Sequence, residues 1–256
     1  MKIYRFKHGS FDEDRYGILR EDQLYPTKES PYVSDTVEKR GIPISEVSLL
    51  PPIRPTKIVA VGLNYQDHAE ERSRPLPKEP LLFLMPPSAV IGPGDDIVYP
   101  EMSDRVDYEG ELAVVLKKKA VRLEEDEDVS SYILGYTCFN DVTARDLQSR
   151  DGQFTRAKSF DTFASAGPCI VTDLDPSFVK LKTFLNGKLR QSGNTANLIF
   201  SIPFLIRFIS RVMTLEPGDV ITTGTPSGIG PMSPGDRVDV QIEGIGTLSN
   251  QVVAPS

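Results

Sequence analysis

Two glutamates stand directly ahead of an apolar stretch that predicts a buried strand. Glu109 and Glu111 precede residues 112–116, a short β-branched run typical of a core strand. Side chains two positions apart on a strand lie on the same face. The two carboxylates would therefore repel each other and lose hydration unless a positive charge lies between them, which favours a divalent cation. The alternative is a solvated sheet edge, where glutamates at this spacing are common.

A third acid, Asp141, follows a second predicted strand, residues 135–140. Three carboxylates without a cysteine or histidine cluster favour Mg²⁺ or Mn²⁺, leave Ca²⁺ possible and disfavour zinc. An octahedral ion held by three protein oxygens keeps about three positions for water or ligand. Such a site suits a 2-oxo acid that binds through its carboxylate and its keto oxygen. The rival interpretation is a non-catalytic β-rich module that holds a divalent ion for structural reasons.

The candidate general base is His68, because the only other histidine, His8, lies in a turn-like KHGS sequence. Glu71 follows His68 by three residues, so both would share one face of a short helix, where Glu71 stabilises the charged imidazole. The alternative is a polar surface histidine. Lys158, within RAKSFD, has surroundings that suggest contact with an oxyanion, although an ordinary surface lysine has the same appearance.

The elements that must position these residues are mostly short strands. The 21 prolines and 19 glycines, set in turn-like pairs, indicate strands joined by turns and a β-rich fold. An apolar stripe predicts one clear helix over residues 201–215, and shorter helices are expected over residues 34–40 and 129–134. The short helix that holds His68 precedes a proline-rich stretch, residues 72–80, so it is well placed to move as a lid.

The chain of 256 residues fits one large domain with a small appendage. Prolines at residues 51–55 predict a boundary between a small N-terminal domain, 1–52, and a catalytic domain, 53–256. The net charge of −7 and the dispersed basic residues argue against a nucleic-acid partner. No signal peptide and no apolar run of about 20 residues is present, which argues against a membrane and predicts a cytoplasmic protein with two reduced cysteines.

Five segments, in this order and spacing, together resemble the fumarylacetoacetate hydrolase family. They are GLNYQDHAEE, DYEGELAVVL, GYTCFNDVTARDLQ, RAKSFDTF and TGTPSGIG. The resemblance extends from about residue 57 to the C-terminus. It implies a mainly β fold with some mixed β and α structure, namely a roll of mixed sheets with few short helices. It also implies a homodimer.

The resemblance implies a role for each candidate residue. The family's metal ligands match Glu109, Glu111 and Asp141, and its water-activating pair matches His68 and Glu71. Its substrate-side groups match Arg145, Gln148, Lys158 and Thr225, of which Thr225 helps to hold the substrate's carboxylate. Larger members that act on fumarylacetoacetate itself carry a further metal-binding acid ahead of the histidine. Residues 61–64 offer none, so this chain resembles the compact acylpyruvase and 2-hydroxyhepta-2,4-diene-1,7-dioate isomerase branch.

The resemblance therefore predicts a Mg²⁺- or Mn²⁺-dependent hydrolase of 2,4-dioxo acids. It would cleave a carbon–carbon bond of an acylpyruvate or a fumarylpyruvate-like acid and leave a metal-bound pyruvate enolate, with Lys158 holding negative charge. The same enolate also serves a 2-hydroxyhepta-2,4-diene-1,7-dioate isomerase or an oxaloacetate-type decarboxylase of aromatic catabolism. The motifs do not choose among these reactions.

Overall fold

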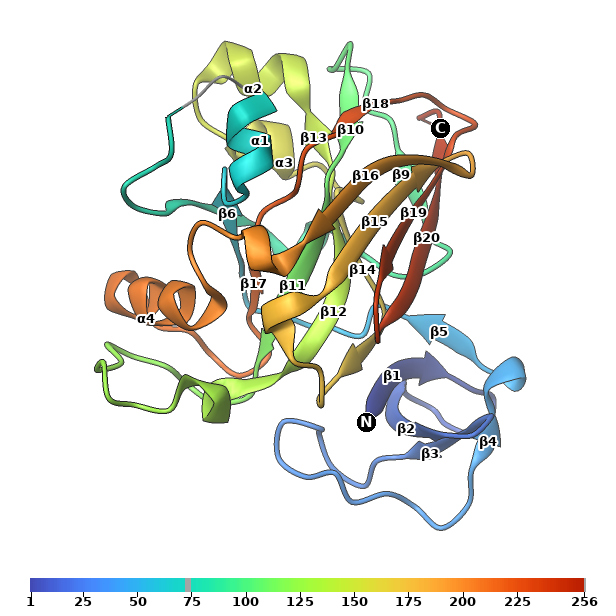
Figure 1. Ribbon diagram of the computed structural model, residues 1–256. Helices are drawn as coiled ribbons and strands as arrows, with labels where there is room; N and C mark the ends of the chain where they lie inside the picture. The colour runs from blue at the N-terminus through green and yellow to red at the C-terminus, as the bar shows by residue number, and fades with distance from the viewer. Residues whose placement is uncertain (72–74, 256) are drawn as a thin grey trace.

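The computed structural model describes residues 1–71 and 75–255, and its secondary structure is mostly β-strand (Figure 1). The predicted mainly β class is therefore confirmed. The largest sheet has twelve strands, of which β5 (Ser48–Leu50) pairs with β1 and β8 (Val90–Ile91) pairs with β14. The other ten follow one another in the order β4 (Ile42–Pro43), β3 (Gln23–Pro26), β2 (Arg15–Arg20), β1 (Lys2–Lys7), β14 (Ala164–Val171), β12 (Ile133–Asp141), β11 (Gly110–Leu116), β17 (Val220–Thr222), β6 (Ile58–Gly62) and β7 (Leu81–Met85).

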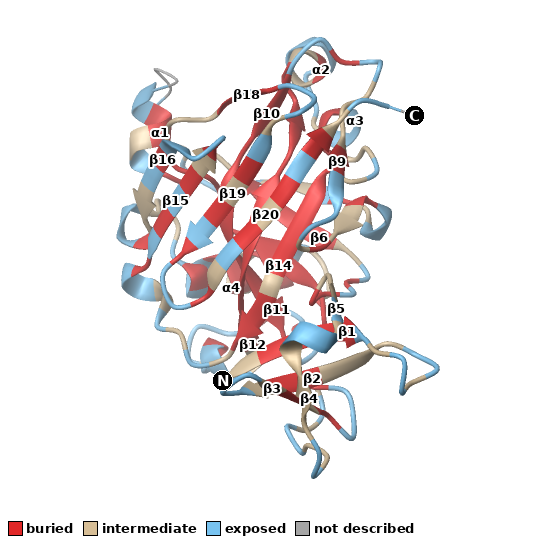
Figure 2. Ribbon diagram, turned by 90° about the vertical axis from the view of Figure 1, so that its right-hand side faces the viewer, coloured by how far each residue is buried: buried red, intermediate tan, exposed pale blue. Residues whose placement is uncertain are grey.

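Two smaller sheets complete the β structure. A five-stranded sheet runs in the order β16 (Lys188–Asn194), β15 (Lys180–Leu185), β19 (Arg237–Ile242), β20 (Gly246–Val253) and β9 (Asp96–Val98). A three-stranded sheet contains β13 (Thr143–Ala144), β10 (Val106–Tyr108) and β18 (Gly230–Met232). The five-stranded sheet packs on the central strands of the large sheet, because Leu112 and Val114 of β11 share one apolar cluster with Val240 and Leu248. Figure 2 shows the resulting buried interior as red segments on both sets of strands.

The N-terminal strands lie at one end of the molecule, away from helices α1 to α3 (Figure 1). They are joined to the large sheet by antiparallel pairing of β1 with β14, in which Lys2 faces Val171 and Ile3 faces Ile170. Because β14 also pairs with β12, the strand that ends at Asp141, the N-terminal strands are linked to that strand through one continuous hydrogen-bonded sheet.

Four α-helices occur among the described residues. They are α1 (Gln66–Glu71), α2 (Arg145–Asp151), α3 (Thr155–Lys158) and α4 (Ile202–Val212). Short 3₁₀ turns add Ile44–Glu46, Pro87–Ala89, Val129–Tyr132, Pro176–Phe178 and Thr195–Asn197. The apolar stripe of α4 is buried at Ile202, Leu205, Ile206 and Ile209, whereas Val212 is exposed. The helix ends at Val212, three residues before the expected end, and Met213 is extended. No helix in the described ranges, 1–71 and 75–255, has both the length and the apolar character needed to cross a bilayer.

Two expected helices are wrong. Residues 34–40 form no helix, because Val37 makes an isolated antiparallel bridge to Thr27 and the segment follows the edge of the N-terminal strands. Residues 129–134 give only one 3₁₀ turn, capped by Asp128, before β12 begins at Ile133. The proline-rich stretch 72–80 was predicted to flank a lid, and its residues 72–74 lie outside the described part of the chain.

Candidate active site

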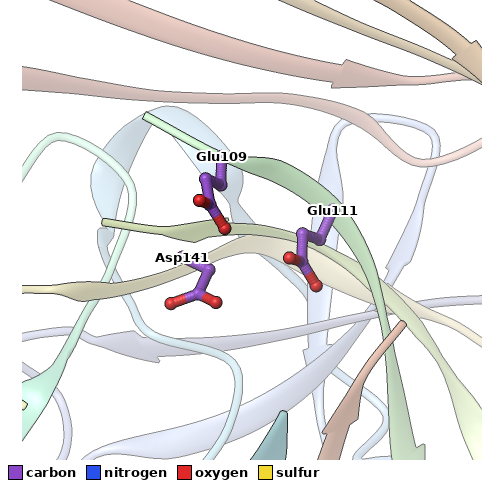
Figure 3. Close-up of side chains that lie close together, drawn as sticks. All are labelled: Glu109, Glu111 and Asp141. Carbon is purple, nitrogen blue, oxygen red and sulfur yellow. The ribbon is translucent and has the colours of Figure 1, made fainter. Parts of the chain in front are cut away.

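Glu109, Glu111 and Asp141 gather at one edge of the two central strands (Figure 3). Antiparallel pairing of β11 with β12 places Gly110 opposite Asn140, so the start of one strand lies beside the end of the other. Glu109 itself lies in the break between β10 and β11 rather than inside a strand. One oxygen from each carboxylate lies within 4.8 Å of the others, and the three residues are at most 7% exposed.

The contacts of these three carboxylates fit a hard divalent cation. Glu109 accepts hydrogen bonds from Arg145 and from Lys158 Nζ, the latter at 2.8 Å. Glu111 Oε2 accepts the backbone N–H of Gly224 at 2.8 Å, and Asp141 Oδ2 accepts from Lys158 at 2.6 Å. Asp141 Oδ1 is buried and has no hydrogen-bond partner in the structure. A buried carboxylate oxygen needs a positive or donating partner, and an all-oxygen set is what Mg²⁺, Mn²⁺ or Ca²⁺ prefers.

The three carboxyl groups differ in how strongly their surroundings favour the charged form. Burial disfavours ionisation of Glu109, but the charges of Lys158 and Arg145 outweigh it and lower the pKa to about 2. Burial and the charges of Asp141 and Glu109 raise the pKa of Glu111 well above its ordinary value. Burial also raises the pKa of Asp141, to about 6, against the opposing effect of Lys158. The cluster therefore contains more carboxyl groups than its two basic neighbours keep ionised, so a further cation would favour the charged forms of Glu111 and Asp141.

Lys158 lies at the end of α3 with 2% of its surface exposed. Burial disfavours its charge, yet the carboxylates of Asp141 and Glu109 raise its pKa above the ordinary value. Its ammonium group also lies 5.3 Å from the centre of the Phe83 ring. A permanent cation in this position is suited to a developing negative charge on a ligand oxygen.

Arg145 begins α2, and each of its three guanidinium nitrogens has a hydrogen-bond partner. Nε donates to Asp107 at 2.9 Å, one terminal nitrogen donates to Gln148 at 2.6 Å, and the other contacts Glu109. Asp107 is fully buried and also accepts from Arg105 at 2.8 Å. Asp107 was not among the residues predicted from the sequence, although it precedes Glu109 by two residues and so continues the same alternation.

The His68–Glu71 pair lies on helix α1. Glu71 Oε2 is 3.0 Å from His68 Nδ1, an i,i+3 contact on one helix face. Glu71 Oε1 accepts the backbone N–H of Gly228 at 3.0 Å, and Asp67 accepts from Ser227 Oγ at 2.9 Å. These contacts fasten α1 to the loop that follows β17. Because the carboxylate favours a proton on Nδ1, Nε2 is left as the basic nitrogen of a neutral imidazole.

All nine predicted site residues except Glu71 line one cavity of about 360 Å³. Its polar lining includes His68, Glu109, Glu111, Asp141, Arg145, Gln148, Lys158 and Thr225. An apolar wall faces them, formed by Val61, Leu63, Leu81, Phe83 and Phe154. The Phe83 and Phe154 rings meet edge to face at 5.2 Å, so this wall is closed by packed aromatics. The predicted residues on β11, β12, α1, α2 and α3 thus line a single small-molecule pocket.

Similarity to known proteins agrees with this geometry. The model of the fumarylacetoacetate (FAA) hydrolase C-terminal domain matches residues 57–253, and a model named Rv2993c-like, N-terminal, matches residues 1–52. A protein of Archaeoglobus fulgidus is 57% identical over 83% of this chain and 84% of its own length. Oxaloacetate tautomerase YisK of Bacillus subtilis is 46% identical over 82% of this chain and 74% of its own length.

Solved structures extend the likeness to the whole chain. A 5-carboxymethyl-2-hydroxymuconate delta-isomerase from Mycobacterium smegmatis is 42% identical and superposes with a TM-score of 0.93, covering 100% of both chains. A maleylpyruvate hydrolase from Sphingobium sp. SYK-6, solved with manganese(II) and pyruvate, is 31% identical with a TM-score of 0.82, again over 100% of both chains. On these matches, the chain belongs to the fumarylacetoacetate hydrolase family.

Proposed function

We propose that this protein is an isomerase that moves a proton on a small 2-oxo acid through an enolate, with oxaloacetate-type acids as the substrate class. The observation that carries the proposal is that a group of candidate cation-binding acids and a basic histidine line one cavity. The acids, which include Asp141 with an Oδ1 that has no hydrogen-bond partner, and the basic His68 line the same cavity. Family members named as tautomerase and isomerase at 46% and 42% identity support the same reaction type.

The acids Glu109, Glu111 and Asp141 would hold the divalent cation, which we propose to be Mg²⁺, with Mn²⁺ as the alternative. When bound, the cation supplies Lewis-acid polarisation of a keto oxygen. Lys158 stabilises negative charge at the same oxygen through its fixed ammonium group. Arg145 holds Glu109 and Gln148 in place, so these polar side chains are already positioned when a substrate carboxylate binds.

His68 performs the proton transfer in this proposal. Its Nε2 takes a proton from the carbon next to the keto group and later returns one, while Glu71 stabilises the imidazolium through Nδ1. Keto and enol forms differ only in where this proton and the double bond lie, so the reaction needs no water and no second substrate. Atoms and charge balance within the bound acid.

Hydrolysis of a 2,4-dioxo acid is the second candidate. One observation favours it, because a histidine held by a glutamate is also the arrangement that activates water. The 31%-identical maleylpyruvate hydrolase shares the fold over the whole chain. In this case His68 removes a proton from water, and the resulting hydroxide attacks the carbonyl at the far end of the acid.

One assay separates the two reactions. The enol form of oxaloacetate and, separately, acetylpyruvate are mixed with protein and Mg²⁺, and enol absorbance and pyruvate are followed together. Accelerated loss of enol without pyruvate supports the isomerase. Pyruvate from acetylpyruvate with release of acetate supports the hydrolase, whereas pyruvate from oxaloacetate alone indicates decarboxylation. Enol decay at the uncatalysed rate would refute the isomerase.

A further inference from the structure

Gln191 is a fully buried glutamine on β16 whose side chain ties three parts of the site together. Its Oε1 accepts the backbone N–H of Gly110 at 2.9 Å. Its Nε2 donates to Thr225 Oγ1 at 2.7 Å and to the carbonyl oxygen of Pro226 at 2.9 Å. One amide group therefore spans the residue between the two glutamates and the loop that lines the other side of the cavity.

The same contacts determine which group Thr225 can offer to a ligand. Its hydroxyl accepts from Gln191 and donates to the carbonyl oxygen of Gly110 at 2.8 Å. The hydroxyl proton is therefore committed to the protein. Thr225 is one of the residues that line the cavity, and among the described residues no acceptor pairs with its backbone N–H. A carboxylate at this position would be met by the backbone N–H rather than by the hydroxyl.

Close packing behind the loop explains how one amide can control its position. A Cβ on Gly110 would lie 2.1 Å from Thr183 Oγ1, so β15 presses directly against the chain between the glutamates. A Cβ on Gly193 would lie 2.6 Å from the ring of Pro226, so β16 packs directly against the loop. Only glycine permits these approaches. They bring β15 and β16 against the two segments that Gln191 joins, at Gly110 and at Pro226.

We propose that Gln191 is a positioning residue for the substrate's carboxylate. It fixes Thr225 so that the backbone N–H faces the ligand, and it fixes Gly110 so that the cation-binding glutamates keep their relation to that N–H. The inference rests on the proposed function in one respect, namely that a 2-oxo acid occupies this cavity. Gln191 touches no ligand itself, and its effect is transmitted through the loop at residues 224–226.

The test compares two buried amides of the same five-stranded sheet. Gln191→Met removes the three hydrogen bonds while nearly conserving shape. The matched control is Asn250→Leu on β20, because Asn250 is also buried and donates to the carbonyl oxygens of Gly92 and Asp95, both at 2.8 Å. The probe is oxalate, titrated by calorimetry at saturating Mg²⁺, with Tm recorded for each variant.

Both variants should lose Tm, because each leaves buried polar groups unpaired. Only Gln191→Met should weaken oxalate binding, by about tenfold, the scale of one hydrogen bond to a charged group. Equal oxalate affinity in the two variants would assign Gln191 a purely structural role and overturn the proposal, as would a parent protein that binds no oxalate.

A second variant covers the case in which Gln191→Met does not fold. Gln191→Glu keeps the acceptor for Gly110 and loses the donors to Thr225 and Pro226, with Asn250→Asp as its control. The expected loss of oxalate affinity is again about tenfold, and an unchanged affinity would refute the proposal. Turnover plays no part in this comparison, so a failure of the proposed reaction would appear in the enol assay alone.

Discussion

The acids that face the cavity are held by paired strands, whereas the His68–Glu71 pair is held by a helix of six residues. Asp141 and Glu111 are each 1% exposed and lie on two neighbouring central strands of the large sheet. The side chain of Glu71 is 38% exposed, and Asp67 and Glu71 join α1 to the loop that follows β17. The structure therefore separates a rigid binding region from a base on a lightly fastened helix.

This difference has an energetic basis. Moving β11 or β12 would break a ladder of backbone hydrogen bonds and expose a core that includes Leu112 and Val114. Moving α1 would break a few polar contacts, each of which contributes about 1 to 3 kcal/mol, and would expose only two buried residues, His68 and Ala69. Changes to the strand-borne acids should therefore affect binding, and changes to α1 should affect proton transfer.

The largest effect is expected from Glu111→Gln. The amide removes one negative ligand, so Mg²⁺ affinity should fall more than about a hundredfold, and turnover with it. Without cation, however, the variant should have a higher Tm than the parent at pH 7, because burial and neighbouring acids raise the pKa of Glu111 and make its charge unfavourable. Calorimetry with Mg²⁺ and thermal unfolding measure the two quantities.

A Glu111→Gln protein with parental Mg²⁺ affinity would remove this residue from the cation site. Glu216→Gln is the matched control, since Glu216 forms an exposed ion pair with Lys119. It should leave both Mg²⁺ affinity and turnover unchanged, because such a surface pair contributes little.

His68→Gln tests the other side of the comparison. Turnover should fall by about 10²- to 10⁴-fold, the usual contribution of a general base, while Mg²⁺ and oxalate affinities stay within about twofold of the parent. Steady-state kinetics and oxalate titration together make the measurement. Parallel losses of turnover and oxalate affinity would mean that His68 belongs to the binding region rather than to a separate catalytic helix.

Much of the binding region could be predicted from the sequence, because its signals are local. Alternation places Glu109 and Glu111 on one side of the chain, and an apolar run marks the strand behind them. The likeness of five short segments to one family predicted the mainly β fold. The helix over residues 34–40 was wrong because a polar segment with little apolar content follows its tertiary neighbours, here through the bridge of Val37 to Thr27.

The supporting residues could not be predicted in this way. Gln191 contacts Gly110 across 81 positions in the chain, and no motif at either position indicates that β16 and β11 are close. Asp107 was within reach of the same alternation that identified Glu109, but its partner Arg145 lies 38 residues further on. Supporting residues such as Gln191 and Asp107 act through contacts between segments that are distant in the sequence. Periodicity along one strand does not specify such contacts, so these residues could not be predicted from it.

The pH dependence of cation binding sharpens the contrast because only the buried acids should control it. Raised pKa values for Glu111 and for Asp141, at about 6, mean that a cation must displace protons to bind. Mg²⁺ affinity should fall about tenfold or more per pH unit below pH 6. Calorimetry in two buffers of different ionisation enthalpy should detect proton release at pH 6 to 7. Binding without proton release would contradict the raised values.

The same shifts predict how stability changes without cation. Both groups have folded pKa values above their ordinary values, so between pH 4 and 7 the folded state binds more protons than the unfolded state. Their contribution to the free energy of unfolding therefore increases as pH falls through this range and decreases as pH rises. Saturating Mg²⁺ should reverse the trend, because the cation binds the deprotonated folded form.

The smallest effect is expected from Ser227→Ala, which loosens α1 without altering any residue of the cavity lining. It removes the 2.9 Å hydrogen bond to Asp67 and leaves the Glu71 contact to Gly228. One such bond is worth about 1 to 3 kcal/mol, so α1 should open more often, and kcat should fall about 3- to 10-fold with oxalate affinity unchanged. Hydrogen exchange over residues 66–71 should increase.

Ser177→Ala provides the matched control for this last variant. Ser177 Oγ donates to Asp175 at 2.7 Å, a similar serine–aspartate bond on the surface near α4 and the 3₁₀ turn Thr195–Asn197. It should change neither kcat nor exchange in α1. If Ser227→Ala instead weakened oxalate binding as much as it lowered kcat, α1 and the carboxylate-binding loop would move as one body, and the division between rigid acids and a lightly fastened base would not hold.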